Sequence, residues 1–150
     1  MFVLVASDHA GYNYKTLLLP VLMEAGFNPV DLGSYDNDPS DYPDHAKAVA
    51  EAILSGKAEK GIIICGSGVG VSIAANKFRN IRAGVCHDTY SAHQCVEHDN
   101  ANVLCIGERV IGTALMNEIC LSFLQASFSN EERHVIRLEK IKSIESNNFK

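Results

Sequence analysis

One cysteine, Cys65, stands where an apolar strand gives way to a glycine-rich turn. It lies in GIIICGSGVGVS, residues 61–72, where three isoleucines precede it and three glycines follow on alternate positions, Gly66, Gly68 and Gly70. Glycines let a backbone approach a ligand closely, and the next helix offers unpaired N–H groups at the positive end of its dipole. This turn therefore favours negative charge, including the thiolate that a catalytic cysteine needs. Ser67 adds a hydroxyl to the same turn.

The turn by itself fits a structural interpretation equally well. A tight connection between strand and helix can carry a buried cysteine that does no chemistry, because cysteine is among the most buried residue types. For three other cysteines, at predicted strand and apolar helix positions, we expect this structural role: Cys86, Cys105 and Cys120.

Two nucleotide-binding motifs do not match the turn. No GK[ST] follows it, so a Walker A phosphate loop is absent, and its spacing is GxGxG rather than the GxGxxG of dinucleotide folds. A dinucleotide-dependent oxidoreductase remains a weak alternative, and it would leave the basic residues near the end of the chain without a role.

Asp8 and His9 follow the first predicted strand in SDHAG. In a parallel sheet the carboxyl ends of strands share one edge, so these side chains should lie near Cys65. An acid beside an imidazole suits proton transfer and hydroxyl binding. Alone, however, Asp8 is better explained as the cap of the next helix.

The segment HDTYSAHQCVEHDN, residues 87–100, is rich enough in His, Asp, Glu and Cys to suggest a metal site. Helical geometry argues against one: His93 and Glu97 share a face, but His98 lies about 140° around the helix from His93. We therefore predict no metal site. His98 at the helix end is either a cation at the negative end of the dipole or a catalytic acid.

A basic face is predicted on the last helix, in NEERHVIRLEKIKSIE. Arg133, His134, Arg137 and Lys140 stand three or four residues apart, with Val135, Leu138 and Ile141 on another face. A solvated surface explains these charges, and so does a clamp in which guanidinium groups bind phosphate. A terminal helix can also reach a neighbouring subunit.

Short apolar runs alternate with helical patterns along the chain, which predicts repeated βα units and a mostly parallel sheet covered by helices. Strands are expected at 2–7, 30–33, 61–65, 82–86 and 102–107, and helices near 12–25, 43–55, 70–78, 90–98 and 113–125. Pro20 should kink the first helix or delay its start. Residues 34–43 form the one long loop.

The composition limits the function classes. The 150 residues suit a single domain, 1–150, and a net charge of −5 argues against general binding to nucleic acid or anionic membranes. Five cysteines without a CxxC pair predict reduced thiols and a cytoplasmic protein. The first apolar run is too short for a signal or membrane segment, so we expect the chain to begin at Met1.

These features together suit an aldose–ketose isomerase acting on a small phosphorylated sugar without cofactor or metal. The chain resembles the family of B-type ribose-5-phosphate isomerases and galactose-6-phosphate isomerase subunits over nearly its whole length. The resemblance is carried by SDHAG, DYP, ICGSGVGVSIAANK, IRAGVC, NVLCIGERVIG and RHVIR.

The resemblance implies a Rossmann-like α/β fold, a three-layer α/β/α sandwich around a five-stranded parallel sheet. It also implies a homodimer or dimer of dimers with active sites at the subunit interface, and a reaction of the pentose phosphate pathway. Cys65 would be the base that moves a proton between carbons 2 and 1, and His98 the acid that opens the sugar ring. Backbone N–H groups of the turn would stabilise the oxyanion, and the Ser67 hydroxyl lies in the same turn. These N–H groups belong to Gly66, Ser67, Gly68, Val69 and Gly70.

By the same resemblance, Asp8 would hold sugar hydroxyls and Tyr42 would line the sugar. Three residues would hold the phosphate, His9, Arg133 and Arg137, with Arg109 contributed across the interface. Asp99 departs from the family pattern, in which asparagine usually follows the histidine, and an ionised Asp99 would repel an enediolate.

Cys65 favours ribose 5-phosphate over galactose 6-phosphate as substrate, and allose 6-phosphate stays open because the motifs do not measure sugar length. A non-catalytic sugar-phosphate sensor is a further alternative. Such a sensor would not need Cys65 and His98 together, and their joint presence favours an enzyme.

Overall fold

The isoleucine run shows why the sheet is covered on both faces. In the computed structural model, which describes residues 1–149, Ile62 and Ile64 point into one apolar core and Ile63 points into another. All three side chains are fully buried. Side chains alternate along a strand, so a run without a polar residue requires helices on both sides.

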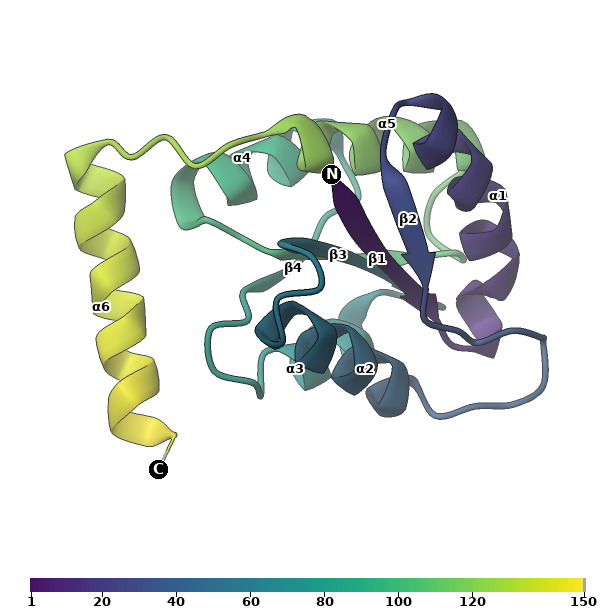
Figure 1. The fold of residues 1–150 in the computed structure, drawn as a ribbon, viewed down its shortest axis with the longest axis horizontal. Coiled ribbons are helices and arrows are strands. Elements are labelled where there is room, and N and C mark those ends of the chain that lie inside the picture. The colour runs from purple at the N-terminus through teal and green to yellow at the C-terminus, as the bar shows by residue number, and fades with distance from the viewer. Residues whose placement is uncertain (150) are drawn as a thin grey trace.

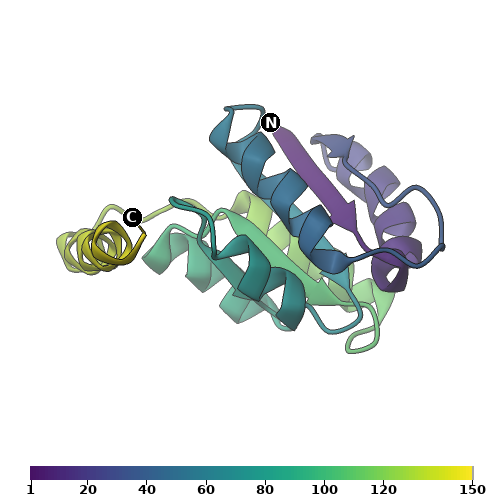
Figure 2. The same cartoon turned by 90° about the horizontal axis from the view of Figure 1, so that it is seen from below.

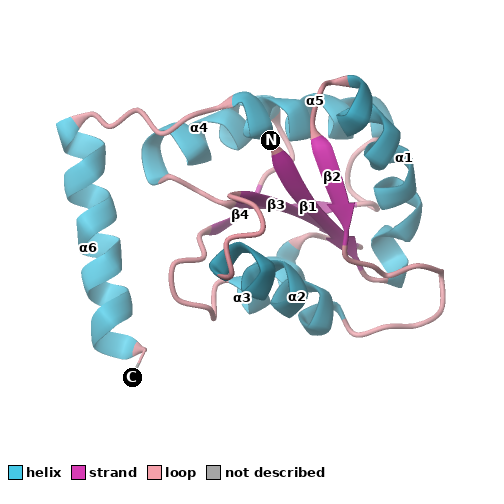
Figure 3. Ribbon diagram, in the orientation of Figure 1, coloured by secondary structure: helices cyan, strands magenta, loops and turns pink. Residues whose placement is uncertain are grey.

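Five parallel strands form one sheet in the order β2-β1-β3-β5-β4. Their bounds are β1 Phe2–Ser7, β2 Asn28–Asp31, β3 Lys60–Cys65, β4 Ala83–Val85 and β5 Val103–Gly107. Helices α1 (Tyr12–Glu24), α4 (Thr89–Asp99) and α5 (Thr113–Gln125) cover one face, and α2 (Tyr42–Leu54) and α3 (Val69–Ala75) cover the other. Figure 3 shows the sheet between these helical layers. The predicted three-layer α/β/α fold is confirmed.

The last helix, α6 (Glu132–Asn148), stands outside the three layers (Figures 1 and 2). It contacts the body through the His134 ring, which stacks on His98 of α4 with 4.1 Å between the ring centroids, and through Glu145, whose Oε1 accepts the backbone N–H of Asn80 at 2.9 Å. Only His134 and Leu138 of this helix are buried, whereas Ile136, Ile141 and Ile144 are exposed. Most of the helix therefore presents its side chains to the outside of the chain.

Some element bounds differ from the sequence-based prediction. β2 lies two residues earlier than the expected 30–33, because the Asp31 side chain accepts the N–H of Gly33, whose φ of +90° ends the strand. α3 begins at Val69 and ends at Ala75, short of the expected residue 78. α1 does not start late: it continues through Pro20, whose position on the exposed side leaves the freed carbonyl of Thr16 to solvent.

Within residues 1–149, no helix combines the length and the apolar character needed to cross a membrane.

Candidate active site

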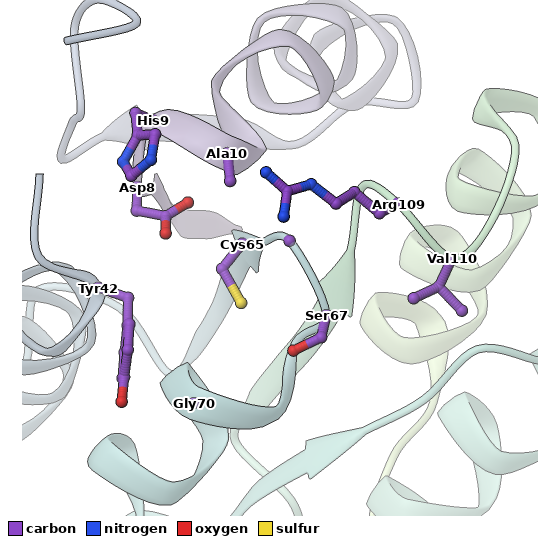
Figure 4. A pocket seen from close by; sticks show the side chains of 10 residues that line it. Asp8, His9, Ala10, Tyr42, Cys65, Ser67, Gly70, Arg109 and Val110 are labelled. Carbon is purple, nitrogen blue, oxygen red and sulfur yellow. The ribbon is translucent and has the colours of Figure 1, made fainter. Parts of the chain in front are cut away.

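A cavity of about 460 Å³ opens where β1 and β3 end, between the start of α2 and the turn that follows β5. Figure 4 shows the side chains around it. Its lining consists of Asp8, His9, Ala10, Tyr42, Cys65, Gly66, Ser67, Gly70, Arg109 and Val110. The volume suits a small organic ligand. The expected meeting of the SDHAG and GSGVG segments at one edge of the sheet is confirmed.

Cys65 is the last residue of β3, and its side chain belongs to the core beneath α2 and α3 while also lining the cavity. The residue is only 5% exposed, but its Sγ accepts a hydrogen bond of 3.0 Å from the backbone N–H of Gly68. The site therefore supplies what a sulfur base needs, namely an N–H donor and an opening to the cavity.

The turn holds this donor in place through a left-handed glycine. Gly68 has φ +80°, and a Cβ there would come within 3.0 to 3.2 Å of the backbone of Ile106 on β5. The next N–H, that of Val69, is taken by Ser67 Oγ at 3.2 Å. Of the N–H groups expected to hold an oxyanion, those of Gly68 and Val69 thus have partners inside the turn. The candidates for substrate are Gly66, Ser67 and Gly70.

Asp8 caps the helical turn that follows it and also lines the cavity. One carboxylate oxygen accepts the N–H of Gly11 at 3.1 Å and caps the short 3₁₀ helix η1 (His9–Gly11). The carboxylate also lines the cavity and points toward its centre (Figure 4). The capping bond fixes the orientation of the carboxylate toward a ligand.

His9 is oriented by the long loop before α2. Its Nδ1 lies 3.1 Å from the backbone nitrogen and 3.2 Å from the carbonyl oxygen of Ser40; where Nδ1 accepts the Ser40 N–H, the ring proton is on Nε2. An Nε2–H group facing the cavity can donate to an anionic oxygen. His45 Nε2 in turn lies 3.1 Å from Ser40 Oγ, and burial lowers the pKa of His45.

Tyr42 and Arg109 close two sides of the cavity. The Tyr42 ring packs over Gly70, where a Cβ would lie 2.8 Å from ring carbons. The Arg109 guanidinium lies above Gly66, at 3.4 Å from the position of a Cβ, and reaches toward Cys65 in Figure 4. Arg109, expected to enter the site from another subunit, lines the cavity of its own chain. The hydrogen bond from its N–H to Gly66 O at 3.1 Å holds it there.

His98 does not reach this cavity within one chain. It lies in the last turn of α4, just before β5 begins, so it sits at the edge where strands start, whereas Cys65 sits where strands end. Its Nδ1 lies 2.9 Å from the side-chain nitrogen of Gln94. Asp99, the final residue of α4, shares this location.

Arg133 and Arg137 lie on α6, which packs on α4 and is likewise remote from the cavity (Figure 1). Both are exposed, and Arg133 Nε donates to Glu131 at 2.7 Å. His134, expected on the same basic face, is buried against His98 instead, and its Nδ1 lies 2.6 Å from Ser129 Oγ. One chain thus builds two groups of predicted site residues: a cavity group around Cys65, and a second group on α4 and α6 of His98, Asp99, Arg133 and Arg137.

The predicted structural cysteines are buried in the core. Cys105 and Cys120 are fully inside the protein, and burial raises the pKa of both thiols. Cys86 is 3% exposed and donates from Sγ to Cys95 Sγ at 3.9 Å, which raises its own pKa and lowers that of Cys95. No group of three or more potential metal-ligating side chains forms within residues 1–149.

Sequence reasoning missed several residues at this edge. Ser40 orients His9 from a loop of turn-forming residues, and nothing in its type distinguishes it from neighbouring polar residues. Ala10 and Val110 line the cavity with small apolar surfaces. His87 accepts a hydrogen bond from Gly107 N–H at 2.9 Å, and in the sequence it was considered only as part of a possible metal site.

Comparison with known proteins places this arrangement among sugar isomerases. Residues 3–141 match the family model described as Ribose/Galactose Isomerase. Ribose-5-phosphate isomerase B of Escherichia coli (strain K12) is 43% identical over 138 residues, which cover 92% of each chain. The family resemblance drawn from the motifs is confirmed.

Solved structures agree with the sequence comparison. Ribose-5-phosphate isomerase B of Clostridium thermocellum superposes with a TM-score of 0.95 at 44% identity, covering 98% of this chain and 99% of the other. The Mycoplasma genitalium ribose-5-phosphate isomerase B, solved with bound ribulose 5-phosphate, gives a TM-score of 0.91 at 38% identity, with coverage of 98% and 97%. Nearly the whole of the described chain thus has counterparts of similar fold.

Proposed function

Because the chain belongs to the ribose/galactose isomerase family, we propose that it interconverts ribose 5-phosphate and ribulose 5-phosphate through an enediolate. The observation that carries the proposal is the position of Cys65 at the edge of the cavity. Its sulfur accepts the Gly68 N–H, and the Asp8 carboxylate and the Arg109 guanidinium line the same cavity. A buried nucleophile that served only packing would not need a dedicated donor at the mouth of a cavity of this size.

In the proposed reaction, the Cys65 thiolate removes the proton from carbon 2 of the open-chain aldose. The electron pair moves toward the carbonyl, which becomes the enediolate oxygen at carbon 1. The thiol then returns a proton to carbon 1, and a proton passes from the carbon-2 hydroxyl to the carbon-1 oxygen as carbon 2 becomes the ketone, so the reaction is balanced without an oxidant. Proton transfer of this kind can proceed without a redox cofactor or a metal.

Four groups of residues that line the cavity suit the negative charge that develops on the enediolate. They are the backbone N–H groups of Gly66, Ser67 and Gly70 and the guanidinium of Arg109. A donor of this type typically contributes about 3 to 4 kcal/mol to the transition state. Asp8 would hold the sugar hydroxyls, Tyr42 would line the chain of carbons, and His9 Nε2–H would donate to the phosphate.

The remaining groups are proposed to come from a second copy of the chain. His98 as the acid that opens the ring, and Arg133 and Arg137 as phosphate ligands, lie away from the cavity of their own chain. A two-fold dimer can bring one copy's α4 and α6 to the other's cavity, and exposed isoleucines on α6 offer apolar surface for that contact. We propose a homodimer, or a dimer of such dimers, of single-domain subunits.

The odd number of cysteines, with all five as free thiols, supports the expected cytoplasmic location. The sugar preference is proposed from Cys65 alone, so allose 6-phosphate belongs in any substrate panel.

Proton NMR in heavy water tests the function. With ribose 5-phosphate, the purified protein should form ribulose 5-phosphate that carries deuterium at carbon 1. A panel with allose 6-phosphate and a four-carbon sugar phosphate would report the length preference. Failure of every sugar phosphate to isomerise, together with tight binding of ribose 5-phosphate, would identify a sensor instead. Quenching or enhancement of NADH fluorescence would point to the oxidoreductase alternative.

A further inference from the structure

In the turn after β4, the side chain of His87 accepts a hydrogen bond that a backbone carbonyl would accept if the strand continued. β4 has only three residues, and its register with β5 pairs Val85 with Cys105, so the position opposite Gly107 is 87. The strand has ended by then, and the side chain of His87 supplies the acceptor that a strand carbonyl would have offered. The Gly107 N–H donates to His87 Nε2 at 2.9 Å.

Gly107 is in direct contact with the catalytic turn. A Cβ at Gly107 would lie 2.7 Å from the backbone of Ser67 and 2.8 Å from Gly66 O, so no other residue fits between the two segments. The two residues that follow bind the same turn. Glu108 N–H donates to Cys65 O at 2.8 Å, and Arg109 N–H donates to Gly66 O at 3.1 Å.

From this chain of contacts we infer that His87 is a positioning residue for the isomerase site: by accepting the Gly107 N–H, it holds segment 107–109 in register with Cys65 and its turn. Two parts of the site depend on that register, namely the N–H groups of the turn and the guanidinium of Arg109. The inference rests on the proposed function, because it assigns His87 a part in the same reaction. His87 itself does not line the cavity.

The role requires a neutral imidazole whose Nε2 carries no proton, because Nε2 must accept the Gly107 N–H. A protonated ring would direct an N–H group at the Gly107 N–H and lose the bond. Burial lowers the pKa of His87, and the neighbouring Asp88 acts in the opposite direction. The Asp88 carboxylate is engaged as the cap of α4, accepting Ser91 N–H at 2.7 Å.

Three variants separate positioning from a general structural role. In His87→Gln the side-chain oxygen stands close to the place of Nε2 and can accept the Gly107 N–H. In His87→Leu no acceptor remains. His93→Gln is the matched control, because His93 lies on the exposed side of α4 beside Glu97 and is remote from Gly107.

Steady-state kinetics with ribose 5-phosphate should give His87→Leu a kcat lower by about tenfold or more, because small misplacement of catalytic groups is costly. KM should change less, by about threefold at most, because the phosphate and hydroxyl ligands are kept. His87→Gln should stay within about threefold of the wild type, and His93→Gln should match it. A wild-type kcat in His87→Leu, or an equal loss in His87→Gln, would overturn the inference.

A second measurement does not depend on isomerase activity. Amide hydrogen exchange at Gly107 should be faster in His87→Leu than in the wild type and His87→Gln, and alkylation of Cys65 by iodoacetamide should change in parallel. If the wild-type protein does not isomerise sugar phosphates, the proposed function fails while these readouts still judge the role of His87. If His87→Leu does not fold, His87→Asn takes its place, since its shorter side chain cannot reach Gly107. Equal exchange at Gly107 in all variants would refute the role.

Discussion

The backbone N–H of Gly68 donates a hydrogen bond of 3.0 Å to the sulfur of Cys65. This bond links the two features that the GSGVG turn combines, a left-handed glycine and a cysteine at the end of a buried strand. It depends on the φ of +80° at Gly68 and on the close approach of that residue to Ile106. The reactivity of the thiol is therefore expected to depend on the conformation of the turn.

Gly68→Ala tests this dependence. An alanine at position 68 is strained in the left-handed conformation, and its Cβ would clash with the β5 backbone. The turn must therefore shift, and the Gly68 N–H must move away from the sulfur. We expect the rate of Cys65 alkylation by iodoacetamide and the kcat each to fall by about tenfold. Gly56→Ala is the control: Gly56 has a φ of +79° with open space around it, so it imposes similar strain far from the cavity. An equal loss in both variants would show that the effect is one of stability alone.

The division of the site between two copies predicts complementation between inactive variants. Cys65→Ala and Arg137→Ala should each be nearly inactive alone. When the two are unfolded together and refolded, random pairing makes half of the dimers hybrid, and one of the two sites in each hybrid is intact. Activity should therefore return to about a quarter of the wild-type value. A mixture as inactive as its components would mean that each site is built by one chain.

Asp99→Asn probes the departure from the family pattern. If an ionised Asp99 lies near the enediolate of the neighbouring copy, removing its charge relieves repulsion, and the activity should stay equal or rise. Asp88→Asn is unsuitable as a control because Asp88 caps α4, and Glu97 is unsuitable because its carboxylate lies 3.7 Å from His98; Glu51→Gln, at an exposed position of α2, serves instead. A loss of more than about tenfold in kcat/KM, equivalent to about 1.4 kcal/mol of barrier, would contradict the repulsion argument.

The ion pair between Lys15 and Asp31 secures the loop that carries Ser40 to His9. Lys15 is 1% exposed and also donates to Ser34 O. Asp31→Ala leaves this buried ammonium without its carboxylate, and because Asp31 is itself partly exposed we expect a loss of about 2 kcal/mol in the free energy of unfolding. Urea denaturation measures it. Glu51→Ala, which breaks the exposed pair with Lys47, should change the stability by less than about 0.5 kcal/mol, and comparable losses in the two variants would refute the expected difference.

Much of the fold could be predicted because its signals are local. The uninterrupted Ile62 to Ile64 run indicates burial on both faces, and alternating strands and helices imply a parallel sheet whose strand ends collect ligands. The bounds of β2 were harder to predict. The strand ends at Asp31, whose side chain accepts hydrogen bonds from Lys15, sixteen residues earlier, and from the Gly33 N–H of the following turn.

The site was predictable where its residues follow strands directly, as Asp8 and Cys65 do. His98 lies in the last turn of a helix that precedes a strand, which places it at the opposite edge of the sheet, and the βα pattern of the sequence already implies this position. That Arg109 lines the cavity of its own chain could not be predicted, since it depends on the path of the turn after β5. His87 was missed because its role depends on the premature end of β4, which only the register with β5 reveals.

The central claim is that Cys65 carries the proton between carbon 2 and carbon 1, and heavy-water NMR with Cys65→Ala tests it most directly. The account predicts that this variant no longer exchanges the carbon-2 proton of ribose 5-phosphate with solvent, while phosphorus NMR or calorimetry shows that the sugar phosphate still binds. Deuterium incorporation at an undiminished rate in Cys65→Ala would contradict the account and assign the base to another group.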